Sequence, residues 1–139
     1  MHKFAPYSPK GCAALDFITN NSMRLLQKGL DFNWQKQRVI SENIANVETP
    51  GYKAKYVSFE DELRRSIAGQ KTSGQVAKAI SDARIQVKTD RSASLRLDGN
   101  NVNADAENVE LARTQLQYDY LVRQISDQFT RLRAVISAR

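Results

Sequence analysis

A long stretch without proline, ending near a Pro-Gly pair, most strongly constrains how this chain folds. Residues 15–45 contain one glycine and no proline, and their apolar residues recur at helical spacing, which predicts a helix over residues 15–46. Asn46 has the side chain for the left-handed conformation that ends many helices. Pro50 biases the preceding residue away from helical angles, and Pro50-Gly51 suits the centre of a type II turn. The sequence therefore predicts a long helix that stops at a sharp corner.

Two asparagines lie on one face of this helix, just before the corner. Asn43 and Asn46 are three residues apart, so their side chains are neighbours on the helix surface. Each amide can donate and accept hydrogen bonds. The sequence leaves open whether these amides bind their own chain or a neighbouring one.

A second long helix is predicted over residues 105–137. Asn103 or Asp105 can cap it, Glu107 lies in its first turns, and arginines lie near its end, so the charges complement the helix dipole. Both long helices carry an apolar seam at heptad-like spacing. The seam of the first helix is Ile18, Leu25, Phe32 and Val39, and that of the second is Tyr118, Val122, Ile125, Phe129, Leu132 and Ile136.

The middle of the chain, residues 47–104, has weaker signals. A turn is followed by a short helix over 58–68, with Ser58 as its cap and Gly69 after its end. Residues 70–97 contain few large apolar side chains. Their alternation fits two short strands, 85–87 and 95–97, in a β-hairpin, and a flexible linker fits equally well. Residues 1–14 are predicted to form a flexible tail.

These elements predict an all-α fold in which the two long helices pair as an antiparallel coiled-coil-like hairpin. A two-helix hairpin buries one seam only. Apolar residues outside it, Leu26, Leu30, Tyr120 and Leu121, remain uncovered. Because helices gain most of their stability from packing, the lone chain is expected to be marginally stable. The pattern favours a subunit of an assembly.

Composition excludes most chemistry. The 139 residues suffice for one domain, and the formal charge of +6 is spread along the whole chain. His2 is the only histidine and Cys12 the only cysteine, so no catalytic triad, metal site or cofactor is predicted. No apolar run is long enough for a membrane span. Pro6 and Pro9 interrupt any signal-peptide core, so we expect no cleaved leader.

Two motifs carry a family resemblance. The pattern Ser41-x-Asn43-Ile44-Ala45-Asn46-x-x-Thr49-Pro50-Gly51-Tyr52 resembles the N-terminal signature of the bacterial flagellar axial proteins, those of rod and hook. Residues 97–103, followed by a long helix, resemble the start of that family's C-terminal helix. Segments 115–118 and 129–136 are most similar to proximal rod proteins. The short chain is unlike distal rod and hook proteins, which insert a β-rich outer domain.

The resemblance implies a role as well as a fold. The terminal helices would form the inner layer of a helical tube that transmits torque and encloses the export channel. The partners would be other copies, neighbouring rod proteins, the ring–rod junction protein and the flagellar type III export apparatus. No nucleic acid, small-molecule substrate or membrane insertion is implied. The matching residues, Asn43, Ile44, Ala45, Asn46, Thr49, Pro50, Gly51 and Tyr52, would set the turn and contact other subunits.

Three alternatives remain open at this point. A neighbouring rod protein of the same family would share the first signature. A cytosolic coiled-coil adaptor or chaperone would explain the seams, and predicts a stable dimer that is not secreted. A basic nucleic-acid-binding helical module would explain the charge, and predicts binding that weakens steeply as salt rises.

Overall fold

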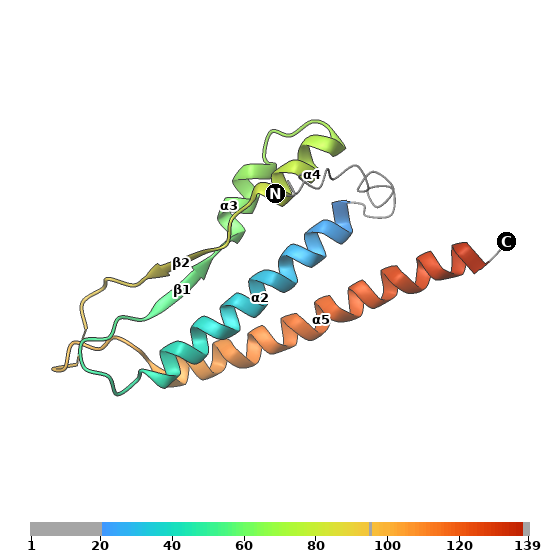
Figure 1. Ribbon diagram of the computed structural model, residues 1–139. Coiled ribbons are helices and arrows are strands. Elements are labelled where there is room, and N and C mark those ends of the chain that lie inside the picture. The colour runs from blue at the N-terminus through green and yellow to red at the C-terminus, as the bar shows by residue number, and fades with distance from the viewer. Residues whose placement is uncertain (1–20, 95, 138–139) are drawn as a thin grey trace, which may run out of the picture.

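The protein is mostly helical, with long helices at both ends of the described chain (Figure 1). The computed structural model describes residues 21–94 and 96–137, so the predicted tail over 1–14 and seam residue Ile18 lie outside the described residues. The elements are α2 (Asn21–Ala45), β1 (Lys55–Ser58), α3 (Glu60–Ile67), α4 (Ser73–Asp82), β2 (Gln86–Thr89) and α5 (Ala104–Ser137).

Helix α2 is the central element. Figure 1 shows α5 running beside it in the opposite direction, and the β1–β2 ribbon with α3 and α4 along another side. Buried side chains of α2 pack against α5 and against the unit formed by β1, β2, α3 and α4. Phe32 stacks on Phe59, with ring centroids 5.4 Å apart, and Ala83 completes this small core. The fold is therefore two long helices with a small sheet-and-helix unit packed on one of them.

The predicted seam of α5 is rotated from the face that meets α2. Tyr118, Ile125 and Leu132 are half-buried, but the other three predicted positions, Val122, Phe129 and Ile136, are exposed. The residues of α5 that face α2 include Thr114, which is fully buried, and Leu121.

Gly29 of α2 explains why α5 turns a different face toward α2 than the heptad spacing predicts. A Cβ added at Gly29 would lie 3.3 Å from Cδ1 of Leu121, so Leu121 fits against α2 where no side chain stands. On α2 itself, Phe32 and Val39 are buried as predicted. Leu25 is exposed, because this part of α2 borders a groove between α3 and α5. Leu121, predicted to lie outside the seam, therefore belongs to it.

The sheet corrects the all-α prediction and the predicted local hairpin. Strand β1 pairs antiparallel with β2, with Lys55 opposite Thr89 and Ser58 opposite Gln86. The residues that pair between β1 and β2 are thus 28 to 34 positions apart in the sequence, and residues 91–94 and 96–97 form no strand. The linker alternative is also wrong for residues 73–82, which form α4. Its cap is a capping box, in which Thr72 and Gln75 exchange side-chain and backbone hydrogen bonds.

Helix α3 starts later than predicted. Its cap position is Phe59, which makes no side-chain capping bond, while Ser58 belongs to β1. Phe59 takes this position because its ring is buried against Phe32. The helix ends as predicted before Gly69, which has a φ of 92°. None of the helices in the described ranges is long and apolar enough to span a membrane.

Candidate functional site: the corner between the long helices

Asn43 joins three elements beside the corner. Its side chain is fully buried. Its Nδ2 donates to the Lys55 carbonyl at 2.7 Å and to Oε1 of Glu107 at 3.0 Å, and its Oδ1 accepts the Lys55 N–H at 2.9 Å. The Tyr52 hydroxyl donates to the same Oδ1 at 3.3 Å. Asn43 thus ties the end of α2 to β1 and to the first turn of α5, within its own chain.

Charged groups surround this buried amide. Lys55 forms an ion pair with Glu42, and this bond raises the pKa of Lys55 above its usual value. Burial raises the pKa of the Glu107 carboxyl, although the bond from Asn43 works in the opposite direction. Burial also raises the pKa of the Tyr52 hydroxyl, helped by the negative charge of Glu42. Burial therefore disfavours the ionised form of Glu107, and the hydrogen bond from Asn43 offsets part of this cost.

The end of α2 differs from the prediction for Asn46. No non-glycine residue in the described ranges has a positive φ, so Asn46 is not left-handed. Its N–H donates to the carbonyls of Glu42 at 3.2 Å and Asn43 at 3.1 Å, which tightens the last turn. Its Nδ2 also donates to the Glu42 carbonyl, at 2.8 Å, and its Oδ1 accepts the Thr49 hydroxyl at 3.1 Å. Asn46 therefore closes the helix end with its side chain.

The turn at Pro50-Gly51 has the predicted geometry. Gly51 has a φ of 71°, and the Tyr52 N–H donates to the Thr49 carbonyl at 3.3 Å. A positive φ at the third residue is what a type II turn requires. Thr49, Pro50 and Gly51 are exposed, Ile44 and Tyr52 are half-buried, and Ala45 is exposed.

Asn100 binds three carbonyls of the turn that follows α2. Its Nδ2 donates to the carbonyls of Asn46, Val47 and Thr49, at 2.8, 3.1 and 2.9 Å. Its Oδ1 accepts the Val102 N–H at 2.7 Å, and its side chain is fully buried. A side chain just before α5 thus holds the turn that follows α2. The sequence predicts only a turn at residues 98–101, because nothing local reveals a partner about 50 positions away.

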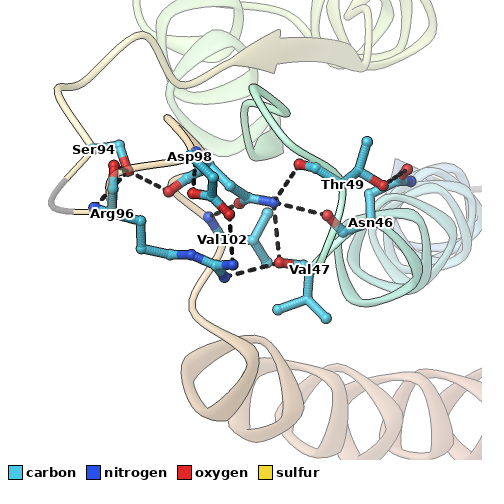
Figure 2. A network of polar contacts seen from close by, with 8 residues as sticks. Asn46, Val47, Thr49, Ser94, Arg96, Asp98 and Val102 are labelled. Atoms are coloured by element: carbon cyan, nitrogen blue, oxygen red, sulfur yellow. Dashed lines mark hydrogen bonds and ion pairs between the residues drawn. The ribbon is translucent and has the colours of Figure 1, made fainter.

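Arg96 and Asp98 also bind the turn that follows α2 (Figure 2). Nη1 of Arg96 donates to the Val47 carbonyl at 2.9 Å, and Nη2 pairs with Oδ2 of Asp98 at 2.7 Å. The Asp98 carbonyl accepts the Gly51 N–H at 2.8 Å. The pKa of the Asp98 carboxyl is lowered, first by the backbone N–H of Asn100 and then by Arg96. The two turns are therefore bonded directly to each other.

The start of α5 follows the prediction closely. Oδ1 of Asn103 accepts the N–H groups of Asp105 at 3.1 Å and Ala106 at 3.2 Å, so Asn103 is the cap. Lys36 on α2 forms an ion pair with Glu110 at 2.5 Å, one turn further on. This pairing lowers the pKa of Glu110. The relative position of α2 and α5 is thus fixed by polar contacts near the corner.

The corner offers structure and no reactive chemistry. Its polar groups are paired with one another. In the part of the chain that the structure describes, no group of three or more His, Cys, Asp or Glu side chains could hold a metal. What the arrangement does is fix the direction in which two long helices leave one point.

Comparison with known proteins agrees with the two motifs. Residues 23–53, which cover most of α2 and the corner turn, match the family described as flagella basal body rod protein. The flagellar basal body rod protein FlgB of Bacillus subtilis is 37% identical over 106 residues, which are 73% of this chain and 82% of that protein. The chain belongs to the flagellar basal body rod protein family. It is a structural subunit of the rod in the flagellar basal body, and not an enzyme.

More distant relatives extend the match over nearly the whole length. The rod protein FlgB of Escherichia coli is 30% identical over 129 residues, 84% of this chain and 94% of that protein. The rod protein FlgB of Borrelia hermsii is 31% identical over 132 residues, 86% and 98% of the two chains. Family membership removes the adaptor and nucleic-acid alternatives.

Proposed function

We propose that this rod protein is a proximal rod subunit whose terminal helices, paired as a coiled-coil hairpin, assemble into a helical tube around the export channel. The observation that carries this proposal is the apolar surface of α5. Leu116, Tyr120, Phe129 and Ile136 are each more than half exposed, and they lie on different faces of the helix. Apolar surface of this extent marks interaction sites. A lone subunit leaves it in water, whereas neighbours in a tube cover it.

The corner has a supporting role in this proposal. Because Asn43 and Asn100 bond α2, β1 and the start of α5 together, each subunit presents both long helices at one fixed angle. The exposed turn residues Thr49, Pro50 and Gly51 are then available for contacts between subunits. The partners are other copies, adjacent rod proteins and the ring–rod junction protein. The flagellar type III export apparatus delivers the chain.

Deletion of the gene in a motile host tests the proposal. We expect basal bodies that stop at the ring stage and have no rod, with motility restored by a plasmid copy. Electron microscopy of isolated basal bodies measures this directly. Intact flagella in the deletion strain would refute the role. Rods that stop at a later, longer stage would place the subunit at a different position in the rod.

A further inference from the structure

Strand β2 forms an open outer edge of the two-stranded sheet. Figure 1 shows β1 between β2 and α2, and among the described elements β1 alone packs closely against β2. All four residues of β2, Gln86–Thr89, are exposed. An edge strand presents backbone N–H and carbonyl groups that can pair with another chain.

The pairing with β1 shows which backbone groups of β2 point outward. The Asp90 N–H donates to the Ala54 carbonyl at 2.7 Å, one step beyond the paired strands. Bonded and non-bonded pairs alternate along an antiparallel ladder, so Lys88 also directs its N–H and carbonyl toward β1. Val87 and Thr89 therefore direct theirs toward the open edge. Among the described residues, nothing hydrogen-bonds to these outward groups.

The opposite edge of the sheet is covered at the same level. Lys55 is opposite Thr89, so its N–H and carbonyl turn away from β2. Both groups bind the side chain of Asn43. The sheet therefore has room for a third strand beside β2.

Charge selects the kind of strand that can bind there. Residues 53–97 contain ten lysines and arginines and five aspartates and glutamates, so this segment holds +5 of the chain's net charge of +6. In or beside β2, Arg84, Lys88 and Arg91 are exposed and form no ion pair with described residues. Unpaired cations at an interaction edge favour an acidic partner.

A second copy of this chain does not supply a matching strand. In the described ranges, no extended segment carries more than one acidic side chain. The acid beside β2 is Asp90, whose carboxylate already accepts the N–H and the hydroxyl of Ser92. A lysine in an edge strand also disfavours pairing between like strands.

We infer that β2 binds an extended, acidic segment of another protein, which adds a third strand to the sheet and places a carboxylate beside Lys88. Main-chain hydrogen bonds to Val87 and Thr89 provide affinity in this mode of binding, and the side chains provide specificity. This contact goes beyond the proposed function, which concerns the long helices.

Amide hydrogen exchange of the full-length chain, followed by NMR, tests the inference. The probe is a seven-residue peptide of threonine and valine with blocked ends and two glutamates four residues apart, the spacing of Arg84 and Lys88. In the free protein, we expect the Lys88 amide to exchange more slowly than those of Val87 and Thr89. Saturating peptide should slow exchange at Val87 and Thr89 at least tenfold. No binding, or binding without this protection, would overturn the inference.

Two control peptides separate strand pairing from charge attraction. The first has lysine in place of both glutamates, and the second carries N-methyl groups on the amides that would face β2. Each should bind at least tenfold more weakly than the probe. Equal binding of the lysine peptide would refute an acidic partner, and equal binding of the N-methylated peptide would refute a third strand.

A matched pair of variants locates the charge effect. Lys88→Glu replaces an opposite-charge pair by a like-charge pair and should weaken binding of the probe roughly tenfold. Lys78→Glu makes the same change of net charge at an exposed residue of α4 and should have little effect. Equal losses in the two variants would mean that overall charge attracts the peptide, which would overturn the contact at β2.

Thr89→Pro tests the backbone edge from the side of the protein. It removes an outward N–H, and proline is tolerated in an edge strand where its nitrogen faces solvent. We expect an unchanged circular dichroism spectrum and at least tenfold weaker binding of the probe. Unchanged binding would contradict the inference, and the N-methylated peptide gives the same test if the variant does not fold. Failure of these tests refutes the β2 contact and leaves the rod role, which the deletion strain tests, unaffected.

Discussion

Asn100 is the residue on which the corner depends most, because one buried amide serves three carbonyls of another segment. Asn100→Ala would remove all three bonds and leave the buried N–H of Val102 without its acceptor, which costs about 1–3 kcal/mol. The three carbonyls keep other donors, namely the Thr49 N–H for Asn46, Arg96 for Val47 and the Tyr52 N–H for Thr49, so each lost bond adds only about 0.5–1.5 kcal/mol. We therefore expect the free energy of unfolding, measured with urea, to fall by roughly 2–4 kcal/mol.

Asn108→Ala is the matched control for this change. Asn108 is exposed on α5, and surface substitutions usually alter stability by less than about 0.5 kcal/mol. Similar losses in the two variants would show that Asn100 does not hold the corner.

Removing the charge of Glu107 and removing the charge of Glu110 are expected to change stability in opposite directions, because the two pKa values are shifted in opposite directions. Burial raises the pKa of Glu107, so the folded chain holds this proton more tightly than the unfolded chain, and stability falls as pH rises through that range. Lys36 lowers the pKa of Glu110, so its contribution is present above its unfolded pKa and is lost as pH falls.

We therefore expect Glu107→Gln, which keeps an acceptor for Asn43, to preserve or raise stability at pH 7. Glu110→Gln should lower stability at pH 7 by about 1 kcal/mol or less. Urea unfolding at pH 4 to 7 measures both. A greater loss from Glu107→Gln than from Glu110→Gln would contradict this sign.

At the scale of elements, the contact between α2 and α5 depends on Gly29. Gly29→Leu would force its side chain against Leu121, and overpacking of this kind costs about 1–3 kcal/mol. Gly29→Ala adds only a Cβ near the flexible end of Leu121, and the higher helix propensity of alanine, about 1 kcal/mol, should offset that contact. Thermal unfolding of both variants measures the difference.

Leu121→Ala provides the control, because it removes the side chain that Gly29→Leu would displace. The double variant should be more stable than the sum of the single changes implies, as for residues in contact. Additive effects would mean that the helices do not meet at Gly29.

Local signals predicted α2, α3 and α5, the Asn103 cap and the Gly51 turn, because each depends on residues within one or two turns. The rotation of α5 was not predictable in this way. Heptad spacing favoured Val122 and Phe129, whereas the observed contact follows Gly29 on the partner helix. The β1–β2 pairing and the Asn100 bonds join segments that are distant in sequence. Only α4 had a usable local signal that was missed, the Thr72–Gln75 capping box.

At the scale of the whole molecule, the corner sets the angle between α2 and α5, and each copy in a rod has to present these two helices in the same way. The variant Gly51→Val tests this role of the corner separately from its effect on stability. Gly51 has a φ of 71°, and an added Cβ would meet no atom within 4 Å. The cost is therefore backbone strain alone, about 1–3 kcal/mol for a branched residue. We expect a small loss of helical stability by circular dichroism and a large loss of rods in the deletion host.

Two other substitutions separate strain at this turn from the loss of a glycine. Gly51→Asn introduces a residue that tolerates a positive φ, so it should restore most rod assembly. Gly74→Val in α4 also adds a side chain in open space, but at a position without a left-handed φ, so rods should still form. Normal assembly of Gly51→Val would contradict the role of the turn. A stability loss that accounts fully for its missing rods would show that the corner acts through folding and not through subunit geometry.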